Sequence, residues 1–182
     1  MTMDAFELLG IPRRLAVSED EVRTAFREAG KRLHPDAGGT DAEFARLQQA
    51  FATLASPSKR LKHWLFLQGA AGDDRGTIST GLMDLFGTVG ETLQQADALI
   101  RKRDETRSAL GLAMLEGAAQ SCREMVERSI FAVDAALVAE TAAFPGIESG
   151  SIPTDEAARH ARNLTFLEKW RANLQERFAR LV

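Results

Sequence analysis

Cysteine is nearly absent from this chain, since Cys122 is the only one among 182 residues. An internal disulfide is therefore impossible, and the cytoplasm is the default expectation for its location. Cys122 lies on an apolar helical pattern, which predicts a small core residue rather than a reactive thiol. His63 and His160 stand at no metal-ligand spacing, so neither a metal site nor another cofactor is expected.

Other absences exclude whole classes of function. No apolar run approaches the roughly 20 residues of a membrane span, and the N-terminus lacks the pattern of a secretory signal. A net charge of −3 argues against general nucleic-acid binding. There is no Gly-rich phosphate loop ending in Lys-Ser/Thr and no nucleophile–base arrangement, which makes an enzyme the weakest interpretation. Alternating strand patterns are missing too, so an all-α fold is predicted.

The most informative feature that is present is His34-Pro35-Asp36, which falls between two helix-patterned segments. Pro35 disfavours the α region for the residue before it, so a helix arriving through Leu33 should end there. Turn-forming residues follow, and Thr40 with Glu43 has the form of a capping box that starts the next helix. The tripeptide is therefore predicted to be displayed at a corner.

Helical patterns surround this corner. A short helix over 4–10 is closed by Gly10, and Ser18 caps a second helix that ends near Leu33. One face of the second helix is apolar, and the other carries a cationic stripe consisting of Arg23, Arg27, Lys31 and Arg32. Apolar residues from Phe44 to Leu54 predict a third helix packed antiparallel on the second. A fourth begins at Pro57 and closes at Gly69.

This order of helices and motifs resembles the J domain of DnaJ-type co-chaperones. The matching pieces are Phe6-Glu7-Leu8-Leu9-Gly10, Ala25-Phe26-Arg27, His34-Pro35-Asp36 and Ala50-Phe51-Ala52-Thr53-Leu54. The resemblance covers about the first 69 residues. Glu28 and Gly30 depart from it, because the family usually has a basic residue and an alanine there. Zinc-finger DnaJ types are excluded by the single cysteine, and no Gly/Phe-rich tract follows the domain.

The resemblance implies stimulation of ATP hydrolysis by a DnaK-type heat-shock chaperone, whose own site performs the chemistry. In that role His34, Pro35, Asp36 and the cationic stripe would contact the chaperone. The stripe could steer the encounter with an acidic patch in a salt-dependent way. Asp36 could accept charge-assisted hydrogen bonds from a partner arginine.

The remaining two thirds of the chain predict a second domain. Small and polar residues over 70–81 form a natural linker between a J domain at 1–69 and a helical domain at 82–182. Long helical patterns run over about 82–104, 112–144 and 154–181, with a loop over 147–153. Lengths and connections of this kind favour an antiparallel three-helix bundle.

A J domain followed by such a bundle is similar to the HscB-type iron–sulfur co-chaperones, which bring a cluster-assembly scaffold to a dedicated DnaK-type chaperone. Matching pieces include Leu82-Met83-Asp84 and Leu164-Thr165-Phe166-Leu167-Glu168-Lys169. The resemblance implies a client-binding patch at Leu82, Met83, Phe86 and Phe166. Its acidic part is replaced here, since Gly87 and Gly90 stand where the family tends to have glutamate. Phe166 fits a wide core face as well as a client surface.

Two interpretations besides an enzyme follow from the sequence. In the first, the protein is a co-chaperone that stimulates a DnaK-type ATPase and presents a client, with an iron–sulfur scaffold favoured. In the second, its J-like domain only docks, or serves another client. Retention of His34, Pro35 and Asp36 favours the first.

Overall fold

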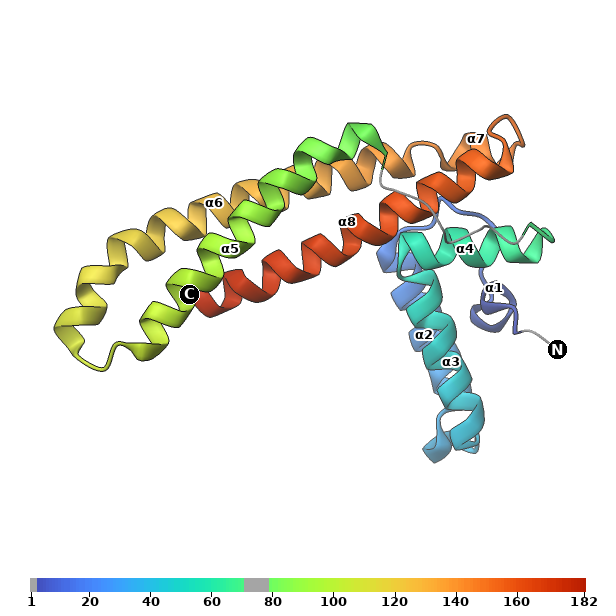
Figure 1. Ribbon diagram of the computed structural model, residues 1–182. Coiled ribbons are helices and arrows are strands. Elements are labelled where there is room, and N and C mark those ends of the chain that lie inside the picture. The colour runs from blue at the N-terminus through green and yellow to red at the C-terminus, as the bar shows by residue number, and fades with distance from the viewer. Residues whose placement is uncertain (1–2, 71–78) are drawn as a thin grey trace. The chain divides into compact units, whose positions relative to one another are not determined.

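The computed structural model describes residues 3–70 and 79–182, which are helical and contain no β-strand (Figure 1). The all-α prediction is thereby confirmed. The chain divides into two compact units, Met1–Gly76 with Glu140–Thr165, and Thr77–Ala139 with Phe166–Val182. Residues 140–165, which the sequence assigned to the bundle, thus belong with the N-terminal unit. Most of the predicted linker, 70–81, lies outside the described residues, and the expected domain boundaries remain a prediction.

The N-terminal unit begins with four helices: α1 (Ala5–Leu9), α2 (Glu19–Leu33), α3 (Asp41–Leu54) and α4 (Pro57–Leu67). Their ends follow the sequence signals. Gly10 closes α1 in the left-handed conformation with φ of 67°. The Ser18 side chain caps α2, and Thr40 with Glu43 forms a complete capping box at α3. Since each cap satisfies otherwise unpaired N–H groups, the helix boundaries were visible in the sequence.

The first four helices share one apolar core. α2 and α3 run side by side as a hairpin (Figure 1), and α1 packs against both. The rings of Phe26 on α2 and Phe51 on α3 lie 4.7 Å apart. Full burial of large side chains at helical spacing stabilises this core. Its largest fully buried members are Phe6, Val22, Leu47 and Leu54.

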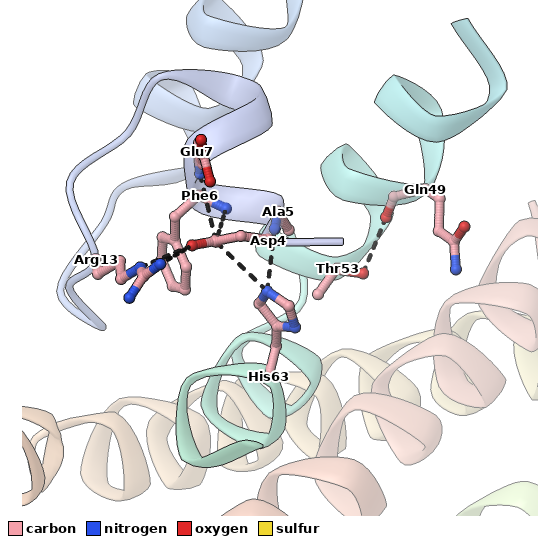
Figure 2. A network of polar contacts seen from close by, with 8 residues as sticks. All are labelled: Asp4, Ala5, Phe6, Glu7, Arg13, Gln49, Thr53 and His63. Carbon is pink, nitrogen blue, oxygen red and sulfur yellow. Dashed lines mark hydrogen bonds and ion pairs between the residues drawn. The ribbon is translucent and has the colours of Figure 1, made fainter. Parts of the chain in front are cut away.

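A polar network joins α4 to the start of α1 (Figure 2). The Nε2 atom of His63 accepts a hydrogen bond of 3.0 Å from the backbone N–H of Ala5. Asp4 caps α1 by accepting from the N–H groups of Phe6 and Glu7, and Arg13 donates to its other oxygen at 2.7 Å. Sequence reasoning missed this network, because residues 58 positions apart meet only in the fold.

Residues 140–165 complete the N-terminal unit, and they include the short helix α7 (Phe144–Glu148) and the first turns of the last helix. The Glu148 carboxylate accepts the backbone N–H of Leu15, and the Arg60 guanidinium lies 5.8 Å from the centre of the Phe144 ring. The predicted loop over 147–153 is therefore wrong at its start. Pro145 is the second residue of this short helix and does not only end the one before, because the first helical turn needs no proline N–H.

The second unit consists of α5 (Met83–Glu105), most of α6 (Ala109–Thr141) and the C-terminal part of α8 (Thr154–Leu181). Val89, Val126 and Leu174 are among the fully buried residues of its core. Arg103 of α5 and Arg123 of α6 each donate a hydrogen bond of 2.8 Å to the Leu181 carbonyl at the end of α8. Cations at a helix C-terminus stabilise its dipole, so the two arginines tie the three helices together.

Cys122 is buried in this second core, and burial raises the pKa of its thiol. The prediction of a core cysteine is confirmed. The segment Ala109–Glu148, by contrast, is long and apolar enough to cross a membrane by length and composition alone. This is weak evidence for a membrane span, because the core helix of a soluble protein passes the same test, and the expectation that the chain has no such span stays a prediction.

Candidate functional site

The His34-Pro35-Asp36 loop is an ordered turn. His34 adopts an extended conformation with φ of −67° and ψ of 139°, as Pro35 requires, and the chain continues as a single 3-10 turn over Pro35–Ala37. The His34 carbonyl accepts hydrogen bonds from the N–H groups of Ala37 and Gly39, at 2.9 and 3.1 Å. These bonds close the loop on itself, so the tripeptide has a fixed backbone.

The His34 ring contacts the loop itself, whereas the Asp36 side chain points outward. The Nδ1 atom of His34 accepts a hydrogen bond of 3.2 Å from the backbone N–H of Asp36 and lies 3.5 Å from the Asp36 carboxylate. The ring also meets the Phe44 ring edge-on, with centroids 4.9 Å apart. The Asp36 side chain is 92% exposed. An exposed carboxylate on a fixed backbone is a ready acceptor for charge-assisted hydrogen bonds from a partner's cation.

Two glycines shape the end of the loop, for different reasons. Gly38 has φ of 94°, in the left-handed region that favours glycine. Gly39 has an ordinary φ, but a Cβ there would stand 2.2 Å from the Leu33 carbonyl oxygen. The sequence indicated a turn at both positions, whereas the need for glycine at Gly39 arises only from the close approach of the α2 backbone.

The cationic stripe lies on α2, and all four of its side chains are exposed, as predicted. Two of them make ion pairs along the helix, Arg23 with Glu19 and Lys31 with Glu28. The hydrogen bond and charge of Lys31 lower the pKa of the Glu28 carboxyl. Glu28, noted above as a departure from the usual pattern, therefore offsets part of the stripe's charge.

Arg27 and Arg32 have no carboxylate within ion-pair distance among residues 3–70 and 79–182; Arg27 donates to the hydroxyl of Thr24 at 3.1 Å. A shallow cavity of about 330 Å³ opens beside Arg27, with Phe26 and Phe51 among its lining residues. Positive charge beside partly exposed aromatic surface suits a partner that carries both acidic and apolar groups.

The four residues expected in a client patch do not share one environment. Met83 and Phe86, on the first turns of α5, are 52% and 49% exposed. Leu82 is only 8% exposed and belongs to the core of the second unit. Phe166 is half-buried against that core. The fold therefore places Met83 and Phe86 at the surface, Phe166 at its edge and Leu82 beneath it.

Trp170 connects the aromatic members of this surface, although sequence reasoning assigned it only to the core. Its ring centroid lies 5.6 Å from that of Phe86 and 6.3 Å from that of Phe166. Tilted aromatic pairs at such distances add to the stability gained from burial. The spacing of residues 166 and 170, four positions apart on one helix, was a signal in the sequence for their contact. The contact of Trp170 with Phe86 on α5 had no such signal.

Comparisons with known proteins agree with this geometry. A family model described as the DnaJ domain matches residues 4–63. Chaperone protein dnaJ A6 of Oryza sativa is 42% identical over 55 residues, which are 30% of this chain and 13% of that protein. Chaperone protein DnaJ of Staphylococcus epidermidis is 27% identical over 126 residues, 62% of this chain and 33% of that protein. The chain thus spans a third or less of these curated relatives.

Residues 4–63 are therefore a DnaJ domain, and the His34-Pro35-Asp36 loop lies within it. The chain as a whole has the fold of HscB. The solved structure of chaperone HscB from Vibrio cholerae matches with a TM-score of 0.62 and 19% identity, over 99% of this chain and 100% of that one. Both resemblances found in the sequence, to the J domain and to the HscB architecture, are confirmed as statements about fold.

Proposed function

We propose that this protein is a co-chaperone that stimulates ATP hydrolysis by a DnaK-type chaperone through His34, Pro35 and Asp36. The observation that carries the proposal is the Asp36 carboxylate, 92% exposed on a loop whose backbone is fixed by His34. Arg27 and Arg32 extend the same surface along α2 and would attract an acidic patch on the chaperone. The DnaJ domain at residues 4–63 supports a chaperone of this class as the partner.

The client would bind to the second unit. Met83 and Phe86 expose apolar surface beside Trp170, and exposed aromatic and methionine side chains are typical of protein interfaces. The HscB fold favours an iron–sulfur cluster scaffold as this client. Gly87 and Gly90 replace the acidic residues that the resemblance leads one to expect, so the contact would rest mainly on apolar burial.

The decisive experiment is steady-state ATP hydrolysis by the cognate chaperone with this protein and with its Asp36→Asn form. Asparagine keeps the shape of the side chain and removes its charge, so stimulation should fall to the basal rate. Asp41→Asn is the matched control, because Asp41 is also exposed and lies just beyond the loop on α3. Equal activity of all three proteins would contradict the proposal.

Adding the scaffold separates the two roles. Further stimulation by the scaffold, lost with Met83→Ala and Phe86→Ala, would support the iron–sulfur client. If the scaffold does not change the stimulation of ATP hydrolysis, the co-chaperone role would stand and the bundle would have another client. Binding without any stimulation would leave the alternative of a J-like docking module.

A further inference from the structure

Within the second unit, the turn between α5 and α6 lies beyond the C-terminal end of α8 (Figure 1). Helix α8 ends where Arg103 and Arg123 bind the Leu181 carbonyl, so it covers little of the hairpin over residues 105–118. Most of those residues are exposed, and the half-buried ones are Thr106, Gly111 and Leu115. The end of the hairpin is therefore open to solvent on most sides.

The turn itself is closely packed. The Ser108 hydroxyl accepts the backbone N–H of Gly111 at 3.1 Å and so caps α6. The Thr106 hydroxyl donates a hydrogen bond of 2.7 Å to the Lys102 carbonyl. A Cβ at Gly111 would stand 2.6 Å from the Thr106 side chain, which leaves room only for glycine. The side chains that follow the turn are thus held on an ordered backbone.

Apolar side chains surround the first turns of α6. Leu110 and Met114 are 74% and 77% exposed, and Leu112 is 41% exposed. Successive residues of an α-helix are turned by about 100°, so Leu110 and Leu112 lie on opposite sides. Ala109 and Ala113 are exposed as well. One partner helix contacts only one side of α6, whereas a lipid surface can surround an apolar end on every side.

Positive charge flanks this apolar end. Arg101, Lys102 and Arg107 are exposed in the last turns of α5 and in the turn that follows. None of the three has a carboxylate within ion-pair distance in the described parts of the chain. An anionic lipid surface attracts a nearby lysine or arginine strongly enough to tighten binding about fivefold for each one.

The carboxylates near the turn offset little of this charge. Asp104 pairs with Arg180 at 2.8 Å, and Glu116 pairs with Arg123 at 2.6 Å. Glu105 is the one carboxylate at this end without an ion pair among the residues that the structure describes. The end of the hairpin therefore has a surplus of positive charge, although the chain as a whole has a net charge of −3.

We propose that the end of the α5–α6 hairpin is a peripheral membrane contact that binds an anionic lipid surface. Leu110, Leu112 and Met114 enter the boundary between the headgroups and the acyl chains. Lys102 and Arg107 contact the headgroup phosphates. Four helical rises separate Leu110 from Met114, about 6 Å, which fits the depth of about 5–10 Å that apolar faces of interfacial helices reach. The contact needs no membrane span, goes beyond the proposed co-chaperone function and does not depend on it.

Co-sedimentation of the full chain with lipid vesicles tests the contact. Wild type should bind vesicles of phosphatidylglycerol and phosphatidylcholine at low salt, and bind vesicles of phosphatidylcholine alone much less. Leu110→Ser combined with Met114→Ser should weaken binding by roughly tenfold or more, because both side chains leave the acyl boundary. Phe131→Ser is the matched control, since Phe131 is as exposed as Met114 on the same helix but far from the turn. Melting temperatures near wild type would show that these exposed substitutions leave the fold intact.

Two charge variants test the contribution of the headgroups. Arg107→Gln should weaken binding to the anionic vesicles about fivefold, because it removes one free cation. Glu105→Gln should strengthen it, because the unpaired carboxylate is repelled by the same lipids. Equal binding of wild type to both kinds of vesicle would overturn the proposal. Absence of vesicle binding would also overturn it, and would leave a protein partner for the apolar end.

A fluorescent label tests which part of the chain enters the lipid. In a Cys122→Ala background, an environment-sensitive fluorophore attached to the thiol of Met114→Cys should shift its emission to the blue when anionic vesicles are added. The same label on Phe131→Cys should not shift. An equal shift at both positions, or vesicle binding that the serine variants at Leu110 and Met114 leave unchanged, would overturn the proposal.

Discussion

His34 and Phe44 meet edge to face with their ring centroids 4.9 Å apart, which joins the loop after α2 to the first turns of α3. The same histidine accepts the N–H of Asp36 through Nδ1. Phe44 thus supports the orientation of the imidazole, and the imidazole supports the backbone of Asp36. We infer that Phe44 positions the loop without needing to touch the partner.

Phe44→Leu should therefore lower the stimulation of chaperone ATPase several-fold, because the His34 ring loses its aromatic support. Stability should fall by only about 1 kcal/mol, since Phe44 is half-buried. Leu8→Ala is the matched control, because Leu8 is also half-buried against the same core but lies on α1, with no contact to His34. Equal loss of stimulation in both variants at equal stability would contradict a positioning role for Phe44.

Gly39→Ala should destabilise the N-terminal unit by about 2 kcal/mol, because the added Cβ meets the Leu33 carbonyl oxygen, a backbone atom that cannot turn aside. Gly30→Ala provides the opposite expectation. No atom lies within 4 Å of a Cβ there, and alanine in a helix interior is favoured by about 1 kcal/mol. Urea unfolding of both variants measures the difference, and a neutral Gly39→Ala would show that the loop is free to shift.

Arg27→Glu should slow association with the chaperone and flatten its dependence on salt, because Arg27 has no carboxylate partner among the described residues to share its charge. Arg23→Glu should slow association by a similar or smaller factor, since Arg23 already pairs with Glu19 on the surface. Stopped-flow association rates between low and physiological salt measure both effects. Rates unchanged by Arg27→Glu would exclude electrostatic steering by this face.

Leu82→Ala should lower the free energy of unfolding by about 2–4 kcal/mol, because Leu82 lies in the core of the second unit. Met83→Ala and Phe86→Ala should change stability far less and weaken client binding instead. Binding can be followed by the fluorescence of Trp170 in a Trp64→Phe background, since these are the only two tryptophans. If client binding does not change the fluorescence of Trp170, and if Met83→Ala and Phe86→Ala bind the client as tightly as wild type, then the client binds elsewhere.

The free energy of unfolding should decrease as pH falls below about 6.5, the ordinary pKa of histidine. Burial lowers the pKa of His63, so the folded state holds the neutral ring and the unfolded state takes up the proton first. The neutral ring is also the form whose Nε2 atom can accept the Ala5 N–H (Figure 2). His63→Gln keeps an acceptor that does not titrate and should remove this part of the pH dependence.

A second loss of stability should follow in more acidic solution. Burial alone would raise the pKa of Asp4, but hydrogen bonds from Glu7, Phe6 and Arg13 outweigh it and lower that pKa. Stability from this carboxylate is therefore present above about pH 4 and is lost as pH falls through the lowered value. Asp4→Asn retains the helix cap and should remove this acidic phase, and it should also lower the pKa of His63 further, because the Asp4 charge raises that pKa. Urea titrations across pH separate the two phases.

Local signals let the sequence predict much of the fold and the loop. Caps at Ser18 and Thr40, the Gly10 stop and the Pro35 helix break act within a few residues, so their effects do not depend on the rest of the chain. Apolar spacing located α2, α3 and the long helices because burial follows the helical period. The position of Asp36 at an exposed corner followed from the same local rules.

Long-range packing decided the rest. Leu82 and Met83 are adjacent in the sequence, yet one is buried in the core and the other exposed, because that outcome depends on where α8 passes α5. Gly39 requires glycine only because the Leu33 carbonyl lies 2.2 Å from where a Cβ would be. The His63 ring contacts Ala5 and Asp4 only because the fold places α4 beside α1. The sequence by itself determined where most of the helices begin and end, through interactions within one or two turns, although it missed α7. The tertiary structure decided which apolar side chains at the ends and edges of these helices, such as Leu82 and Met83, became core or surface, since their burial depends on neighbours that are distant along the chain.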